Sequence, residues 1–192
     1  MKFFDVIRNR QSIRAFKDKD IEHEKINIIL ESANLAPSAG DLQAYEVVMI
    51  KEPQRRYALA KAALDQNFIA QAPLNLIFFI NPKRSVWRYG QRGAKLYSLQ
   101  DATIAATYAQ LSATALGLGS VWVGAFDAKS IIELTGAKED LVPVAIISIG
   151  YPDEKPKITT RRKIEDLVHD EYLLKQYGYI PSNLRLSRPY GY

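Results

Sequence analysis

The sequence predicts an α+β sandwich, in which helices cover both faces of one sheet. Two observations in the 192 residues lead to this fold class: helical and extended patterns alternate but the strands are few, and one long alanine-rich helix lies near the middle of the chain. A Rossmann domain is the rival interpretation, but no G-x-G-x-x-G follows a strand, because GLGSVWVG comes after a helix. No repeat or change in composition marks a second domain, so we expect one domain over residues 1–192, with 171–192 as a C-terminal arm.

The N-terminal half contains three helical patterns and one strand. Apolar side chains within 3–7 give a first helix its stripe, and apolar residues at helical spacing recur over 21–36 until APSAG ends that helix. YEVVMI (45–50) is a short, β-branched run typical of a buried strand. A helical pattern then resumes over 53–70 after a proline.

The C-terminal half adds the other strands and the long helix. LNLIFFI (74–80) is a second buried strand, and the polar, aromatic stretch 81–93 is expected to be a connection. Alanines and threonines occupy nearly every face of a helix from about Ala94 to Leu116, which indicates close packing on several sides. The remaining pattern is a short strand between two turns at 117–126, a short helix at 128–136 and a strong strand at 142–152.

Composition limits the classes of function. A net charge of +5 and a pI near 9.3 favour an anionic partner, such as nucleic acid, an acidic membrane or a phosphorylated small molecule. No cysteine occurs, and His23 and His169 are far apart among charged residues, so we expect no disulfide and no metal site. The N-terminus lacks the apolar run of a secretory signal, and segment 102–126 lacks the roughly 20 strongly apolar residues of a spanning helix, so we expect a cytoplasmic protein.

The stretch RNRQSIRAF places Arg10, Ser12 and Arg14 at alternate positions. In an extended segment alternate side chains point the same way, at about 3.3 Å per residue, so these three polar groups would face one target. Because two of them are cationic, that target should be anionic. From these residues alone, the alternative is a solvated basic turn after the first helix.

Further stretches have residues suited to binding a ligand. The loop APSAGDLQ could offer backbone N–H groups to a planar heterocycle, and GLGSVWVGAF sets glycines beside apolar residues, which lets backbone approach a flat ligand. Arg161 and Arg162 precede a predicted short helix, where their guanidinium groups suit a phosphate. The alternatives are an ordinary connection and a solvated surface. Asp101 could be a general acid, but we favour a structural carboxylate tied to backbone or arginine.

In this order, the motifs resemble the nitroreductase family of flavin mononucleotide (FMN) oxidoreductases. The resemblance covers residues 1–170, and its pieces are R-x-S-x-R (10–14), PSAGDLQ (37–43), RGAKLYSLQDATIAA (92–106), GLGSVWVGAF (117–126) and ISIGYPDEKPKITTRRKIED (147–166). It implies a three-layer α/β/α sandwich with a mostly antiparallel sheet and a central long helix. It also implies a homodimer that binds FMN non-covalently at its interface.

The resemblance also assigns roles to the matched residues. Arg10 and Ser12 are implied to bind the FMN phosphate and ribityl chain, and Arg161 or Arg162, or both, to close on the phosphate. Gln11 is also expected among the cofactor-binding residues. Arg14 and Gln66 should lie near the pyrimidine edge of the flavin. The backbone implied near flavin N5 and O4 is that of Val123, Gly124 and Ala125. A loop that the partner subunit lays beside the ring consists of Pro37, Ser38, Ala39, Gly40 and Gln43.

Three residues in or beside that loop depart from the commonest family pattern. Asp41 stands where Asn is usual, Ala44 where Pro is usual, and Tyr45 where Trp is usual. A carboxylate at Asp41 changes the hydrogen bonds that the loop can make. Substrate contacts are expected from variable segments, in particular from Trp87 and Tyr89 and from the tyrosine-rich tail.

The resemblance therefore implies an enzyme, an NAD(P)H-dependent FMN oxidoreductase that reduces flat, electron-poor acceptors such as nitroaromatics or quinones. No catalytic side chain is expected, because the flavin carries the chemistry at N5 and donor and acceptor would use one slot in turn, in a ping-pong scheme. A specialised family reaction, such as flavin fragmentation, dehalogenation or dehydrogenation, is an alternative. A basic nucleic-acid-binding protein is another, but arginines and aromatic residues are not interleaved on one predicted sheet face. We expect no nucleic-acid or membrane partner.

Overall fold

The computed structural model describes residues 2–156 and 159–180. The chain divides into two compact units, Met1–Lys155 and Pro156–Tyr192, and each is described by itself. The expectation of a single domain with an arm from residue 171 stays a prediction, and residues 181–192 of that arm lie outside the described residues.

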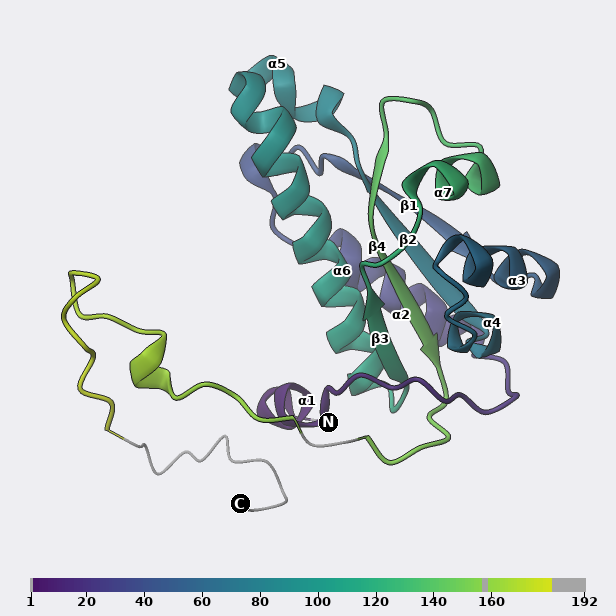
Figure 1. Ribbon diagram of the computed structural model, residues 1–192, viewed down its shortest axis with the longest axis horizontal. Coiled ribbons are helices and arrows are strands. Elements are labelled where there is room, and N and C mark those ends of the chain that lie inside the picture. The colour runs from purple at the N-terminus through teal and green to yellow at the C-terminus, as the bar shows by residue number, and fades with distance from the viewer. Residues whose placement is uncertain (1, 157–158, 181–192) are drawn as a thin grey trace. The chain divides into compact units, whose positions relative to one another are not determined.

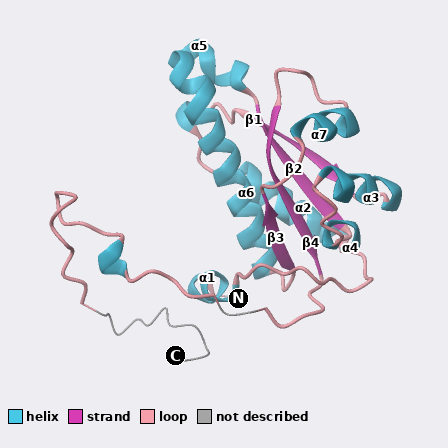
Figure 2. Ribbon diagram, viewed as in Figure 1, coloured by secondary structure: helices cyan, strands magenta, loops and turns pink. Residues whose placement is uncertain are grey.

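Within the described residues, the first unit is built on an antiparallel sheet with the strand order β1-β2-β4-β3 (Figures 1 and 2). Its strands are β1 (Tyr45–Ile50), β2 (Leu74–Ile80), β3 (Gly119–Val123) and β4 (Val142–Gly150). The inner strands β2 and β4 are almost entirely buried, which is why they read as continuous apolar runs in the sequence. β1 and β3 form the two edges of the sheet.

Helices cover both faces of this sheet. Because side chains alternate along a strand, Leu76 and Phe78 of β2 face one core, whereas Ile77 and Phe79 face the other. The first core is closed by α2 (His23–Asn34) and α6 (Ser98–Ala115), and the second by α3 (Pro53–Ala62), α4 (Phe68–Gln71) and α7 (Ala128–Thr135). Figure 2 shows the magenta strands between these two groups of helices. The prediction of a three-layer α/β/α sandwich is confirmed.

The long helix α6 packs closely because its buried positions are small. The alanines that contact the sheet and α2 are fully buried, namely Ala102, Ala105, Ala106, Ala109 and Ala113. An alanine adds little bulk between two backbones, so helix and sheet can approach closely. The close packing predicted from the all-round small residues is confirmed.

The predicted connection 81–93 is wrong, because this stretch is helical. It forms α5 (Pro82–Arg92), which begins with a proline at its first turn and contains a kink at Gly90, where φ is 57°. A π-helical turn, η2 (Gly93–Tyr97), then leads directly into α6, so the predicted start near Ala94 falls inside that turn. Few residues of 82–92 are apolar, although Pro82, Val86 and Tyr89 recur at helical spacing.

The predicted helix over 53–70 is interrupted. Leu64 and Asp65 both have a φ of 58°, a left-handed conformation that ends α3 before α4 begins. Neither glycine nor proline marks the break, so the helical spacing of the apolar residues predicts one uninterrupted helix.

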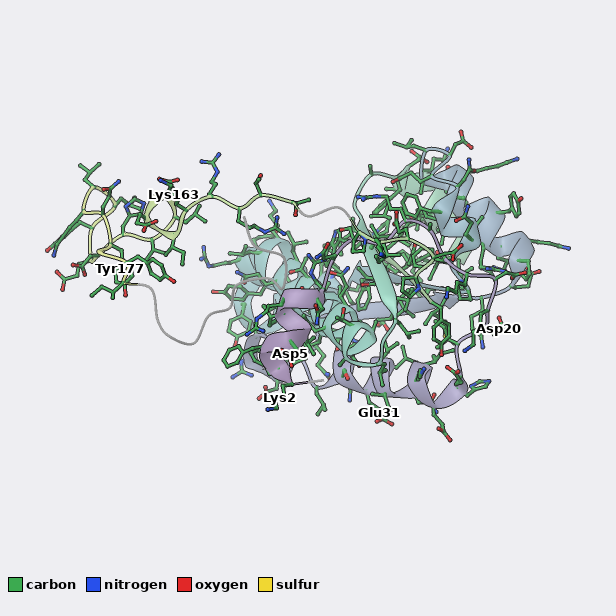
Figure 3. The ribbon with its side chains drawn as sticks, turned by 90° about the horizontal axis from the view of Figure 1, so that it is seen from below. Lys2, Asp5, Asp20, Glu31, Lys163 and Tyr177 are labelled. Carbon is green, nitrogen blue, oxygen red and sulfur yellow. The ribbon has the colours of Figure 1, made fainter. Side chains whose placement is uncertain are left out.

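The first helix, α1 (Phe3–Asn9), lies beside α2 and α6, and Figure 3 shows this side of the molecule with Asp5 on α1 and Glu31 on α2 labelled. Only Val6 of α1 is buried, whereas Phe3 is 67% exposed, so the expected apolar stripe is largely open. A groove of about 580 Å³ separates the three helices. No helix in the described part of the chain is long and apolar enough to cross a membrane.

The second unit contains one short helix among its described residues, the 3-10 turn η3 (Ile164–Asp166). An antiparallel bridge joins His169 to Gln176, and an ion pair of 2.8 Å joins Lys175 to Asp170. The short helix predicted after Arg162 is thus present as a single turn.

Candidate functional site

The R-x-S-x-R segment is pinned to one end of the sheet. Ser12 forms a parallel bridge to Ser120 of β3, and the N–H of Ile13 donates to the carbonyl oxygen of Ser120 at 3.0 Å. Phe16 forms an antiparallel bridge to Pro152, just after β4. The segment is therefore extended and fixed in register, as its alternating pattern predicts.

The side chains of this segment alternate between the core and the surface. Ile13 is buried, whereas Ser12 and Arg14 are exposed and Arg10 is half-buried. The guanidinium carbon of Arg14 lies 6.0 Å from the ring centre of Phe68, at the start of α4. The side-chain oxygen Oε1 of Gln11 is buried and has no hydrogen-bond partner within the described ranges, 2–156 and 159–180.

The backbone of the segment is also held by the chain that follows β4. The carboxylate of Glu154 accepts hydrogen bonds from the N–H groups of Arg14 and Ala15, the latter at 3.2 Å. In return, the N–H of Asp153 donates to the carbonyl oxygen of Ala15 at 2.9 Å. These bonds fix the backbone and leave the side chain of Arg14 directed to the surface.

Two glycines allow the segment to lie this close to the sheet. A Cβ atom on Gly119 would meet the side chain of Ile13 at 2.8 Å, and one on Gly150 would meet Phe16 at the same distance. Real Cβ contacts are longer than this, so both positions need a residue without a side chain. Gly119 therefore leaves room for the side chain of Ile13. The sequence pattern suggested instead that the glycines of GLGSVWVGAF let a flat ligand approach the backbone.

The loop that follows β3 is braced by Gln66. Its side-chain amide donates to the carbonyl oxygen of Ala125 at 2.9 Å and to that of Ala63 at 2.8 Å. Val123 is the buried last residue of β3, and Gly124 and Ala125 after it are exposed. Gln66 therefore fixes the backbone of the loop, a role that the sequence did not indicate.

These contacts bring two of the predicted motifs to one corner of the fold. Phe68 touches Arg14, and Gln66, two residues earlier in the chain, holds Ala125. The R-x-S-x-R segment thus presents a cation and a hydroxyl at the start of β3, and the exposed backbone of Gly124 follows the other end of the same strand. Among the described residues, no group of three or more acidic or histidine side chains could hold a metal ion.

The PSAGDLQ loop has an unusual backbone conformation. It contains the 3-10 turn η1 (Ala39–Asp41), and φ is positive at Gly40 (60°), Asp41 (58°) and Gln43 (45°). Asp and Asn tolerate the left-handed conformation better than most residues do, so Asp41 suits its position as Asn would. The Oγ of Ser38 accepts a hydrogen bond of 3.0 Å from the N–H of Gln43, which closes the loop on itself. Pro37, at its start, is exposed.

Asp101 ties both ends of this loop to α6. Its carboxylate is 2% exposed, and its two oxygens accept hydrogen bonds from the N–H groups of Ala39 at 2.9 Å and Ala44 at 3.1 Å. The structural carboxylate favoured from the sequence is thus confirmed, with backbone as its partner. Next to the loop, burial raises the pKa of Tyr45, whose hydroxyl donates to the carbonyl oxygen of Ala33 at 3.1 Å.

Helix α5 lies over the outer side of the loop. Arg88 donates to the carbonyl oxygen of Gly40 at 3.1 Å, and the hydroxyl of Tyr89 lies so close to Gly40 that a Cβ there would be 2.4 Å away. One turn earlier, Arg84 donates to the carbonyl oxygen of Gln43 at 3.0 Å. Arg84 and Arg88 are four residues apart, a spacing that identifies one helix face only once the helix itself is recognised.

The two predicted substrate residues point to different places. Tyr89 lies on the loop, whereas Trp87, which is 71% exposed, lines a separate groove of about 650 Å³ between β1, α5 and the chain after α7. Ion pairs between Lys83 and Asp140 (2.9 Å) and between Arg84 and Glu46 (2.6 Å) cross that groove. The structure therefore separates the pair that the sequence grouped.

Within one subunit, the PSAGDLQ loop and the R-x-S-x-R corner lie at opposite edges of the sheet. The loop leads into β1, whereas Ser12 is paired with β3, and β2 and β4 lie between these edges. At about 4.8 Å per strand, the edges are about 14 Å apart. One subunit therefore does not bring the two motifs together.

Arg161 and Arg162 belong to the second unit and are exposed. The guanidinium of Arg161 donates to the hydroxyl of Thr159 at 2.7 Å and to the carbonyl oxygen of Thr160 at 3.0 Å. That these arginines close on a phosphate stays a prediction.

Comparison with solved structures first identifies the class of fold. NADPH:FMN oxidoreductase from Vibrio harveyi, solved with NAD+, superposes with a TM-score of 0.81 at 26% identity, over 95% of this chain and 80% of that one. An FMN-dependent nitroreductase from Clostridium difficile gives a TM-score of 0.75 at 30% identity, over 87% of this chain and 98% of that one. The predicted nitroreductase-like fold is confirmed.

The sequence comparisons then identify the family. The model of the nitroreductase family matches residues 7–85 and 66–151. A relative from Archaeoglobus fulgidus, whose name gives NADH dehydrogenase and NAD(P)H nitroreductase as its activities, is 32% identical over 155 residues, which are 78% of this chain and 86% of that protein. This chain belongs to the nitroreductase family, a family of oxidoreductase enzymes, as its motifs indicated.

Proposed function

We propose that this protein is an FMN-dependent oxidoreductase that takes reducing equivalents from NADH or NADPH and passes them to flat, electron-poor acceptors such as nitroaromatics or quinones. The observation that carries the proposal is that the segment paired with the start of β3 exposes Ser12 and Arg14, while Gln66 holds the exposed loop that follows the same strand. Membership of the nitroreductase family supports the same reaction class and favours it over nucleic-acid binding.

The residues at this corner fit FMN by their chemistry. Arg10 and Ser12 supply a cation and a hydroxyl for the phosphate and the ribityl chain, and charge-assisted hydrogen bonds to phosphate are among the stronger ones in proteins. The buried Oε1 of Gln11, unpartnered within the described residues, is an acceptor for a ribityl hydroxyl. Arg161 and Arg162 are proposed to add their guanidinium groups to the phosphate.

FMN, when bound, supplies a ring that accepts and donates hydride, and the protein supplies position and charge. The guanidinium of Arg14, which lies 6.0 Å from the ring centre of Phe68, would supply positive charge at the pyrimidine edge, where a reduced flavin is negative. Gln66 holds the loop so that the N–H groups of Gly124 and Ala125 can donate to the ring. No side-chain acid is proposed, because the flavin would carry the hydride chemistry, and donor and acceptor would use the same slot in turn.

We propose that a second copy of the chain completes the site. The R-x-S-x-R corner offers one wall, whereas the PSAGDLQ loop of the same subunit lies at the far edge of the sheet. The groove between α1, α2 and α6 is lined mostly by apolar side chains, among them Phe3, Ile28 and Tyr108, each at least 39% exposed. Burial of these side chains against a second copy would join two subunits and bring the partner's loop to the flavin.

The acceptor would then meet residues from the partner's loop and α5. Tyr89 lies directly on that loop, so it is the proposed acceptor contact. Trp87 faces a different groove, and its contact with an acceptor requires the assembled dimer. The tail, of which residues 181–192 lie outside the described residues, is proposed to reach the partner as an arm.

The purified protein tests the proposal directly. It should be yellow, release FMN rather than FAD on acid precipitation, oxidise NADH or NADPH, and sediment as a dimer. A colourless protein that fails to bind added FMN would refute the cofactor, and a monomer that keeps FMN and activity would refute the shared site.

A matched pair of variants tests the interface. Ile28→Glu places a charge in the groove, so dimer and FMN should be lost together. Tyr57→Glu places the same charge on α3, in the opposite helical layer, where Tyr57 is 66% exposed, and should change neither. Deletion of 176–192 tests only the arm.

A further inference from the structure

We infer that Asp101 is a positioning residue that presets the PSAGDLQ loop for the flavin of the partner subunit. The inference rests on the proposed function, because it concerns how this chain prepares one wall of that shared site. Asp101 lies on α6, apart from the R-x-S-x-R corner, and acts only through the backbone of the loop.

The carboxylate of Asp101 accepts two hydrogen bonds from the loop, which we together call the clamp and singly its two prongs. Oδ1 accepts from the N–H of Ala39 at 2.9 Å and Oδ2 from the N–H of Ala44 at 3.1 Å, so one carboxylate holds both ends of the turn. The group is 2% exposed, and burial of a carboxylate is costly unless donors surround it. Its anchor, α6, is packed against the sheet and does not shift easily.

The backbone between the two prongs needs such support. Asp41 and Gln43 have positive φ values, and a non-glycine residue such as Gln43 adopts this left-handed conformation only where its surroundings hold it there. The backbone–backbone bonds inside the turn are long, at 3.2 Å from the N–H of Asp41 and 3.3 Å from that of Leu42, and the bond from the N–H of Gln43 to the Oγ of Ser38 adds to them. Without the clamp, the loop would relax to other conformations, and binding of FMN would have to order it again.

Ala44 makes the second prong possible in this chain. Proline, which is usual at this position in the pattern that the loop resembles, has no N–H and could not donate to Oδ2. Ala44 is fully buried, so water does not replace the bond. The departure from the family pattern at residue 44 thus adds a hydrogen bond to the loop.

Asp101→Asn tests the clamp because it keeps the shape of the side chain. An amide can accept at one oxygen only, and its NH₂ would face an N–H donor at the other prong. The control is Thr114→Val on the same helix, which removes the buried hydrogen bond of 3.0 Å from Thr114 to the carbonyl oxygen of Gln110 and touches no part of the loop.

Two readouts are compared in both variants. Amide hydrogen exchange over 37–45 should accelerate about tenfold or more in Asp101→Asn, and the dissociation constant of FMN, measured by flavin fluorescence, should rise about tenfold. Thr114→Val should change neither, even if its melting temperature falls. Unchanged exchange in Asp101→Asn would overturn the clamp, and faster exchange with unchanged FMN affinity would overturn its role in positioning.

The wild-type protein provides a second test, which holds even if Asp101→Asn does not fold. After FMN is removed, the amides of Ala39 and Ala44 should stay protected, whereas those of Asp41 and Leu42 should exchange faster. Equal loss of protection at all four amides would overturn the inference. If the wild-type protein never binds FMN, the proposed function fails, and the role of Asp101 toward flavin fails with it.

Discussion

Gly119→Ala should destabilise the protein because it pushes Ile13 away from β3. The new Cβ would lie 2.8, 2.9 and 3.0 Å from three carbon atoms of Ile13, whereas carbon atoms in contact prefer about 3.5–4.0 Å. Ile13 is 5% exposed and has no free space to enter. Overpacking of this kind costs about 1–3 kcal/mol, and the loss of chain entropy in the unfolded state offsets about 0.4–1 kcal/mol of it. The expected net loss is about 1–2 kcal/mol.

Urea unfolding followed by circular dichroism measures that loss. In an Ile13→Ala background, two of the three clashing carbon atoms are gone, so Gly119→Ala should cost much less there. Gly124→Ala is the steric control, because its new Cβ would have no heavy atom nearer than 3.8 Å. An equal cost of Gly119→Ala in both backgrounds, or a cost no larger than that of Gly124→Ala, would refute the reasoning.

Arg10→Ala should raise the dissociation constant of FMN about ten- to a hundredfold, since a charge-assisted hydrogen bond contributes roughly 1.5–3 kcal/mol. A fluorescence titration measures this constant, and an unchanged value would tell against the phosphate site. Ser148→Ala should cost about 1–3 kcal/mol in urea unfolding, because the buried Oδ1 of Asn75 loses its donor at 2.6 Å; a loss within error of zero would contradict this. The pKa of Glu22 is lowered to about 2, mainly by a hydrogen bond from Tyr151, from an ordinary value of 4.5. The contribution of this carboxylate to the free energy of unfolding is therefore complete above about pH 4.5 and is lost as the pH falls through about 2. The difference in free energy of unfolding between wild type and Tyr151→Phe should narrow over that range of pH. A difference that does not depend on pH would be inconsistent with this reasoning.

The strands were the most predictable part of the fold. The boundaries predicted for 45–50 and 74–80 coincide with β1 and β2. The inner strand β2 has helices on both faces and buries nearly every side chain, so it reads as one apolar run, whereas β1, at the edge, is half-buried but equally rich in apolar residues. The alanine-rich helix was recognisable for a related reason, since burial on several sides requires small residues all round.

Helix α5 was missed because few of its residues are apolar, although those few recur at helical spacing after a proline. Its residues show no buried stripe, and its face is held by the bonds of Arg84 and Arg88 to the PSAGDLQ loop. The break at Leu64 and Asp65 was missed because neither glycine nor proline marks the left-handed conformation there.

For the candidate site, the sequence indicated the residues that face outward and missed those that hold them. The alternating positions of Arg10, Ser12 and Arg14 identified them, since successive side chains of any extended segment point to opposite sides. The carboxylate of Glu154 and the ring of Phe68 meet Arg14 from segments remote in the sequence. No local pattern in the sequence encodes such contacts, because these residues meet only in the folded chain.

Because of the π-helical turn η2, the orientation of α5 is sensitive to the deletion of a single residue. A π turn holds one residue more than an α-helical turn does, so deletion of a single residue within Gly93–Tyr97 would restore a regular α-helix. Everything on its N-terminal side, Tyr89 included, would then rotate by about 100° around the helix axis and shift by about 1.5 Å relative to α6. Single-residue insertions and deletions at this turn would thus give evolution a discrete way to redirect the side chains of α5, while the sheet and the R-x-S-x-R segment stay as they are.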